Sequence, residues 1–322
     1  MLYVREVLPV KFAKPALPVQ QQRVRLESRG LLIEDAAETE HYLRFIGYYR
    51  LSAYALPLQQ CALPDKPFKP GSTFRNILNL YRFDRELRLL VMDAVERIEV
   101  AARSVIVNEM SIRHGPHWYM DAAHFNPASH RFKHHELLNR IDREFTILAG
   151  GRTPGKPHHE VFINHYFNKY TSPYLPPSWM VAETLTLGTW SQIFENLKVT
   201  AERKAVAAPF GVDEQLLRNW LHVLTYIRNL CAHHARLWNR RLVIKITVAR
   251  KHQSFLKVND RFYAVAVVLH ELMQKIAPTT GWHERLAALL QAHPFADPAA
   301  LGFPPNWASE PFWNPPSHEF SI

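Results

Sequence analysis

The feature that most constrains the fold is a stretch of 40 residues, 73–112, that contains neither glycine nor proline. Apolar side chains recur along it at steps of three or four residues, with a single step of seven: Ile77, Leu80, Leu87, Val91, Ala94, Ile98, Ala101 and Val105. This spacing places them on one face of an α-helix. The other side carries charged residues, among them Arg82, Arg85, Asp93, Glu96 and Arg103. The sequence predicts one long amphipathic helix here, with its N-cap supplied by Gly71-Ser72.

The rest of the chain also follows helical patterns, and no convincing series of alternating strands occurs. Further helices are predicted at residues 20–29, 34–46, about 130–148, 158–170, from Ser178 onward, 213–238, 259–277 and 284–292. The aromatic-rich residues 47–54 predict a packed corner, and three prolines within residues 1–20 predict an extended arm. The fold class is therefore all-α. We divide the chain into an N-terminal helical segment packed on the core (1–70), a helical core (71–290) with a long irregular insertion at about 113–178, and an irregular tail (291–322).

Composition narrows the class of function. Lys and Arg total 39 against 29 Asp and Glu, a net charge of +10, which favours a polyanionic partner, nucleic acid ahead of an acidic membrane surface. An ordinary basic soluble protein is the alternative.

Cys61 and Cys231 lie too far apart in sequence for a disulfide scaffold and are too few for a Cys₄ zinc module. Apolar runs such as residues 264–269 are too short to cross a bilayer. We expect a soluble cytoplasmic protein that does not enter a membrane.

The chain has 18 histidines, so a metal site has to be considered. His130 and His134 are four residues apart, and two histidine doublets occur, at 134–135 and 158–159. None forms a His-Glu-x-x-His motif, and no acidic cluster accompanies them. We interpret them as surface histidines and predict neither a metal nor another cofactor.

The predicted helix at 213–240 separates two stripes when it is projected at about 100° per residue. One stripe is apolar and consists of Leu217, Trp220, Leu224, Ile227, Cys231, His234 and Trp238. The opposite stripe is polar and consists of His222, Tyr226, Asn229, His233, Arg236 and Arg240. This polar stripe lacks acids and lysines and offers groups for phosphate contact and proton transfer. The projection assigns function to His233 and a buried, structural role to His234.

Several ordered blocks carry a resemblance to a known family. Arg228-Asn229-Leu230-Cys231-Ala232-His233 matches the Arg-Asn-x-x-x-His signature of HEPN ribonucleases. More specifically, the chain resembles the Abi-like abortive-infection family of bacteria, the AbiD/AbiF type. Further matching blocks are Gly47-Tyr48-Tyr49-Arg50-Leu51-Ser52, Tyr81-Arg82-Phe83-Asp84-Arg85-Glu86-Leu87-Arg88, Glu96-Arg97-Ile98-Glu99-Val100 and the seven residues from His234 to Arg240. The resemblance extends over roughly residues 15–245.

The resemblance implies a HEPN-like helical core and metal-independent cleavage of RNA that leaves a 2′,3′-cyclic phosphate. His233 would act as general base or acid, and Arg228 would hold the scissile phosphate. Asn229 would orient His233 or the phosphate by hydrogen bonds. From the polar stripe, His222, Tyr226, Arg236 and Arg240 are predicted to contact the RNA. The resemblance further implies a homodimer, with the cleft formed where two copies meet. It also implies a toxin of anti-phage defence with an antitoxin, either a small noncoding RNA or a protein.

Two alternatives stay open at this point. Arg228 projects about 140° away from His233 on a regular helix, so it could instead form a structural ion pair with Glu96 or Glu99. The protein could also bind RNA without cutting it, with Tyr48, Tyr49 and Arg50 stacking on unpaired bases rather than packing in the core. A pure protein-interaction module would not need the acid-free polar stripe.

Overall fold

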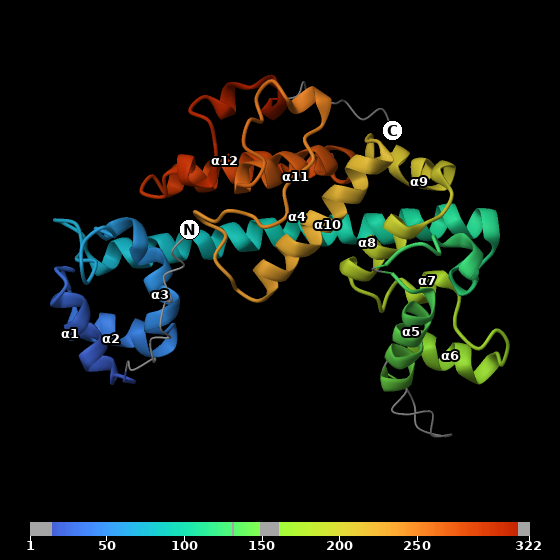
Figure 1. Ribbon diagram of the computed structural model, residues 1–322, viewed down its shortest axis with the longest axis horizontal. Coiled ribbons are helices and arrows are strands. Elements are labelled where there is room, and N and C mark those ends of the chain that lie inside the picture. Colours follow the sequence, from blue (N-terminus) through green and yellow to red (C-terminus); the bar gives the residue numbers. More distant parts are fainter. Residues whose placement is uncertain (1–14, 131, 149–160, 315–322) are drawn as a thin grey trace, which may run out of the picture. The chain divides into compact units, whose positions relative to one another are not determined.

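The computed structural model describes residues 15–130, 132–148 and 161–314, and within these ranges it contains helices and isolated bridges but no β-strand (Figure 1). The predicted all-α class is confirmed. The α-helices are α1 (Val19–Glu27), α2 (Ala36–Phe45), α3 (Tyr48–Ala55), α4 (Phe74–His114), α5 (His134–Leu148), α6 (Val161–Lys169), α7 (Ser178–Val181), α8 (Leu187–Asn196), α9 (Thr200–Ala207), α10 (Glu214–Ala232), α11 (Phe262–Ile276) and α12 (Trp282–Ala292).

Most of these helices lie where the sequence predicts them, but α3, α7, α8, α9 and the end of α10 differ from the prediction. The aromatic segment 47–54 is not a corner but helix α3, and the corner itself is Gly47, whose φ of 94° is easily reached only by glycine. The helix predicted from Ser178 is broken into α7 and α8, because Thr186 caps a new helix by accepting a hydrogen bond from the backbone N–H of Thr189. Helix α9 was not predicted.

The chain divides into two compact units, Met1–Phe83 and Asp84–Ile322. The division lies inside α4, whereas the predicted boundary lies before that helix. Residues 74–83 therefore belong to the first unit and supply part of its core through Phe74 and Ile77, both buried. The reason is that one face of a long helix can be covered by different elements at its two ends.

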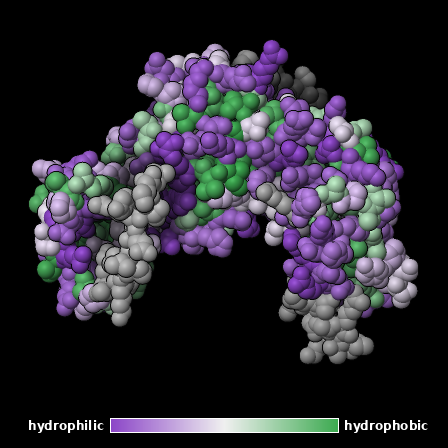
Figure 2. All heavy atoms as spheres, in the orientation of Figure 1, coloured by the Kyte–Doolittle hydropathy of each residue, from purple (hydrophilic) through white to green (hydrophobic). Residues whose placement is uncertain are grey.

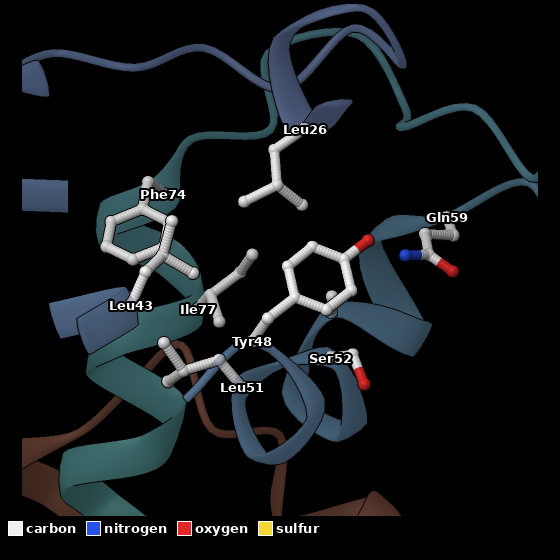
Figure 3. Close-up of a pocket in the computed structure, with 9 residues that line it drawn as sticks. Leu26, Leu43, Tyr48, Leu51, Ser52, Gln59, Phe74 and Ile77 are labelled. Atoms are coloured by element: carbon white, nitrogen blue, oxygen red, sulfur yellow. The ribbon is translucent and has the colours of Figure 1, made fainter. Parts of the chain in front are cut away.

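The first unit packs α1, α2 and α3 around the beginning of α4. Its core side chains surround a small apolar pocket (Figure 3), lined by Leu26, Leu43, Tyr48, Leu51, Ser52, Ala55, Gln59, Phe74 and Ile77. The cavity measures about 10 Å³, which leaves room for about one water molecule. We therefore interpret it as a packing defect and not as a ligand site.

The N-terminus of α4 is capped by Thr73 and not by Ser72. The Thr73 hydroxyl accepts from the backbone N–H of Asn76 (3.2 Å), and the Asn76 side chain accepts from the backbone N–H of Thr73 (2.8 Å). This reciprocal pair satisfies two N–H groups that the first turn of a helix leaves without partners. Ser72 instead donates to the carbonyl of Leu58.

In the second unit, residues 84–114 of α4 form a spine that several helices contact. From α12, the Trp282 indole N–H donates to the carbonyl of Leu90 (2.9 Å), and Arg285 pairs with Asp93. From α8, the backbone N–H of Leu187 donates to the Glu99 carboxylate (3.0 Å). Glu99 is therefore already engaged at the N-terminus of α8, where a negative charge is stabilised.

Helix α11 is the most buried element of the second unit, with residues from Phe262 to Met273 shielded from solvent. It lies beside α12 (Figure 1), and on the viewed face hydrophobic residues gather around α11 and the segment before it (Figure 2). The described part of the tail, predicted to be irregular, contains short 3₁₀ helices. Its Trp313 stacks on His270 of α11 at a ring-centroid distance of 4.9 Å. No helix in the described ranges combines the length and apolar character needed to cross a bilayer.

Protonation of His270 is expected to make stability depend on pH. The pKa of this histidine is lowered to about 4, mainly by burial and also by the adjacent His283, whereas the Phe312 carbonyl and the Glu271 carboxylate raise it. Between pH 6.5 and pH 4 the unfolded chain binds the proton and the folded chain does not, so stability falls as pH falls. We expect a loss of about 3 kcal/mol between pH 7 and pH 4.

Urea unfolding at several pH values checks this expectation. The neutral variant His270→Gln should show a smaller loss, and the exposed control His130→Gln should match the wild type. The pH dependence of stability that remains in His270→Gln arises in part from Glu271. Burial raises the pKa of Glu271, but hydrogen bonds from His252 and Lys251 outweigh burial, so its pKa is lowered. Its stabilising contribution is present above its unfolded pKa and is also lost as pH falls. An unchanged slope in His270→Gln would contradict the assignment.

Candidate functional site

The predicted apolar and polar stripes are both present on α10 (Glu214–Ala232). Leu217, Trp220, Leu224, Ile227 and Cys231 are buried. On the opposite face, His222 and Asn229 are exposed and Tyr226 is half-buried. Helical periodicity therefore predicts correctly which α10 side chains reach solvent.

Helix α10 ends at Ala232, and the predicted continuation to about Trp238 is wrong. His233 is the C-cap residue, and His234 follows with a φ of 55°, in the left-handed region. The N–H of His234 donates to the carbonyl of Cys231 (2.9 Å), and the N–H of Ala235 donates to the carbonyl of Leu230 (2.8 Å). These two bonds define a Schellman motif, which satisfies the last carbonyls of a helix and reverses the chain.

This reversal changes the role predicted for His234. The side chain was expected on the buried stripe, but His234 is exposed, so its predicted position in the core is wrong. The reason is that a left-handed residue leaves the helical path and no longer follows the projection. His233 is exposed as predicted, directly at the end of the helix.

Replacing His234 by glycine is expected to stabilise the protein by about 0.5–1 kcal/mol, because glycine adopts the left-handed conformation without the steric cost that a Cβ atom imposes. His234→Ala should give no such gain, since alanine keeps the Cβ. Urea unfolding of the two variants provides the comparison. Equal stabilisation by alanine and glycine would mean that backbone conformation is not the cause.

After the reversal, the chain returns to α4 and is held there by Asp84. One Asp84 oxygen accepts from the backbone N–H groups of Leu237 (3.0 Å) and Trp238 (2.6 Å). The other accepts from the guanidinium of Arg88, one turn further along α4. Asp84 has no exposed surface, and Arg88 is buried. Two of the sequence blocks, 81–88 and 234–240, are thus joined directly by these bonds.

The role of Asp84 was not predicted from the sequence, although a signal for it exists. Asp84 and Arg88 lie on the same helical face as Leu80, Leu87 and Val91. A charged pair at a spacing of four residues within an apolar stripe indicates a buried polar contact, because charges are rarely buried without partners.

Arg236 and Arg240 lie in the returning segment, so they do not extend the polar stripe of α10 as predicted. Both are half-buried, and the Arg240 Nε donates to the carbonyl of Arg236 (2.7 Å). Residues 215–241 nevertheless contain five arginines and no acidic residue. This part of the chain therefore carries the positive charge that contact with phosphates requires.

The side chains of Arg228, Asn229 and His233 do not take part in hydrogen bonds or ion pairs among the described residues. Asn229 and His233 are exposed, and Arg228 is half-buried. In the part of the chain that the structure describes, no side-chain hydrogen bond or ion pair engages any of the three, and neither Glu96 nor Glu99 pairs with Arg228. Glu96 is exposed. The structural alternative for Arg228 is therefore not supported, and its guanidinium is free to bind an anion.

Cys231 lies within the motif but is not a candidate nucleophile. Burial raises the pKa of its thiol to about 12, with the nearby Asp84 acting in the same direction and Arg88 against it. Because the thiolate is the reactive form, this cysteine is an inert core residue.

None of the histidines weighed as metal ligands belongs to a group of three or more potential metal ligands among the described residues. His134 lies with its Nε2 2.9 Å from the carbonyl of Tyr119, whereas His130 is exposed. The doublet His158-His159 lies outside the described residues.

Residues 41–239 match the family model of the Abi-like proteins. The match covers more than half of the chain and includes α4, α10 and the Arg-Asn-x-x-x-His motif. The chain belongs to the Abi-like family. Curated proteins and solved structures give no match. Membership assigns this Abi-like protein to abortive infection, a form of antiviral defence, and confirms the family part of the predicted resemblance.

Proposed function

We propose that this Abi-like protein is a HEPN-type endoribonuclease toxin that cleaves RNA without a metal through Arg228, Asn229 and His233. The observation that carries the proposal is the end of α10. There the Schellman motif leaves His233 exposed one turn after Arg228 and Asn229, in a segment rich in arginine and free of acids.

The reaction follows from what these groups can do. His233 removes the proton from a ribose 2′-OH, and the 2′-oxygen attacks the adjacent phosphorus. A P–O2′ bond forms, the P–O5′ bond breaks, and the leaving 5′-oxygen takes a proton from an imidazolium. The products are a 2′,3′-cyclic phosphate and a 5′-hydroxyl. Arg228 binds the phosphate oxygens and stabilises the charge that develops on them, and Asn229 orients the phosphate or the imidazole.

RNA is expected to lie along the exposed face of α10 that leads to His233. His222 and Tyr226 precede Asn229 at steps of four and three residues, so they extend the same face by about 10 Å. Tyr226 offers a ring for stacking, and His222 offers a hydrogen-bond donor to phosphate. Arg236 and Arg240 are expected to contact the RNA from the returning segment, where both are half-buried.

Incubation of purified protein with RNA in the presence of EDTA tests the proposal. Cleavage should persist without metal, and the 3′ ends should carry cyclic phosphates, which sequencing of RNA ends detects. Binding without cleavage would favour the second candidate function below, and cleavage that EDTA abolishes in a folded protein would contradict the mechanism.

The second candidate is an RNA-binding protein that does not cut its ligand. It is favoured by the exposure of Tyr49, at 91%, and of Phe45, at 72%, on α3 and α2 respectively. Arg44 and Arg50 are exposed nearby in sequence. Exposed rings beside guanidiniums can stack on unpaired bases. Tyr48 lines the small pocket instead (Figure 3), so only part of the predicted stacking group faces solvent.

We further propose that the active form is a homodimer in which two copies of the motif form one cleft. Co-expression of wild type with excess His233→Ala chains should produce mixed dimers with one incomplete motif. Cleavage per wild-type chain should then fall well below that of wild type alone. Constant activity per wild-type chain, with mixed dimers demonstrated by affinity tags, would show that each protomer cuts RNA independently.

A toxin of this kind needs an antitoxin, because unrestrained RNA cleavage would kill the cell that makes it. The net charge of +10 suits a small noncoding RNA in this role. Co-purification followed by RNA sequencing distinguishes such an RNA from a protein antitoxin.

A further inference from the structure

A cluster of two histidines and one glutamate lies at the C-terminal end of α4, within the second unit. His114 is the last residue of α4, His124 ends the 3₁₀ helix Ala122–His124, and Glu202 lies in the first turn of α9. The His114 Nε2 is 2.6 Å from a Glu202 oxygen, and the two imidazole rings are 4.1 Å apart between centroids. One donor atom from each residue lies within 4.8 Å of the other two.

The backbone around the cluster is fixed by hydrogen bonds that do not involve its side chains. The N–H of Lys198 donates to the carbonyl of His124 (2.8 Å), and the N–H of Asn126 donates to the carbonyl of Asn196 (2.9 Å). Between them, Phe125 and Leu197 form an antiparallel bridge. This pairing brings the loop that carries His124 beside the segment that leads into α9 and Glu202. The loop that carries His124 is therefore held beside the segment leading to Glu202 by backbone bonds alone.

Glu202 provides an independent indication that a ligand is involved. Its side chain is 7% exposed, and one oxygen contacts His114. The other oxygen is buried and has no hydrogen-bond partner among the described residues. A buried carboxylate oxygen without a partner is costly. A bound cation would satisfy it.

The donor set indicates the class of cation. Two imidazole nitrogens and one carboxylate oxygen suit borderline divalent metals, above all Zn²⁺, which accepts these ligands at about 2.0–2.2 Å. Tetrahedral ligands at that distance lie about 3.3 Å apart. To reach this arrangement, the His114 and Glu202 donors must move apart from 2.6 Å, and donors that lie up to 4.8 Å apart must move closer together. The side chains of His114 and His124 are 26% and 18% exposed, which gives an ion a path from solvent.

We propose that His114, His124 and Glu202 bind one Zn²⁺ ion, with water in the fourth position. The ion links the end of α4, the loop before Phe125 and the first turn of α9. Thirty residues of α4 separate His114 from Asp84, or about 45 Å along the helix. The ion is therefore remote from the RNA-cleaving motif, and the proposal is independent of the proposed function. Sequence spacing did not reveal the site because its three ligands are widely separated in the chain.

Metal analysis of the full-length protein tests this site. The chain is purified with a tag that contains no histidine, stripped with a chelator, dialysed against Zn²⁺ and measured by elemental analysis. We expect one more zinc ion per wild-type chain than in His124→Ala or Glu202→Gln. Zn²⁺ should raise the melting temperature of the wild type and leave that of both variants unchanged. Co²⁺ in its place should give the intense visible absorption of a tetrahedral site in the wild type alone.

The exposed His135→Ala variant is the matched control and should keep the full zinc content. Both ligand variants are expected to fold, because His124 is partly exposed and the glutamine side chain introduced by Glu202→Gln is neutral and nearly isosteric with glutamate. Zinc content in Glu202→Gln equal to that of the wild type, or absence of stoichiometric zinc in a folded wild type, would overturn the proposal. RNA cleavage by Glu202→Gln should equal that of the wild type.

Discussion

Replacing Asp84 by alanine is expected to lower the free energy of unfolding by about 3–5 kcal/mol, because it removes one partner of a buried ion pair. The Arg88 guanidinium would remain buried without its carboxylate, and the N–H groups of Leu237 and Trp238 would lose their acceptor. Because the free energy of unfolding of a domain is only about 5–15 kcal/mol, this substitution would remove a large fraction of it. Urea unfolding measures the loss as a lower midpoint at unchanged slope.

Asp93→Ala is the matched control for this experiment. Asp93 is on the same helix and pairs with Arg97 and Arg285, but all three side chains are partly exposed. Solvent screening limits such pairs to about 0–1 kcal/mol. The double variant Asp84→Leu/Arg88→Met should recover part of the stability lost in Asp84→Ala, since it leaves no buried charge. If Asp84→Ala were as stable as Asp93→Ala, the contacts of Asp84 with Arg88 and with residues 237–238 would make no net contribution to the free energy of unfolding.

Replacing His233 by alanine is expected to reduce RNA cleavage by about 10²–10⁴, the usual contribution of a general acid or base. Folding should be retained, because the side chain is exposed and the capping bonds are made by backbone atoms. The measurement is the single-turnover cleavage rate, together with the melting temperature of each variant. Toxicity on induced expression should fall in parallel.

His234→Gly is the control that distinguishes the two adjacent histidines. It retains the chain reversal and should cleave RNA at a rate close to that of the wild type. Arg228→Lys should lose activity while keeping its charge, because a lysine cannot bind two phosphate oxygens in the planar geometry of a guanidinium. Full activity of His233→Ala with loss of activity in His234→Gly would show that our proposal assigns catalysis to the wrong histidine.

The sequence by itself determined the helical fold and much of the candidate site. The 40-residue stretch without glycine or proline predicted α4, which spans Phe74–His114. The stripe from Leu217 to Cys231 predicted the buried face of α10. Both depend on the period of the helix, which relates residues only a few positions apart. The exposure of His222, Asn229 and His233 could be predicted for the same reason.

Only the tertiary structure decided where α10 ends and what holds the chain beyond it. Periodicity continued through His234 and Trp238, yet the helix stops at Ala232. The reversal at His234 lets the backbone N–H groups of Leu237 and Trp238 reach Asp84, more than 150 residues earlier in the chain. No local pattern encodes such a contact, because it depends on the path of the chain between its two ends. The same holds for His114, His124 and Glu202, whose proximity arises only when α4, its following loop and α9 are packed together.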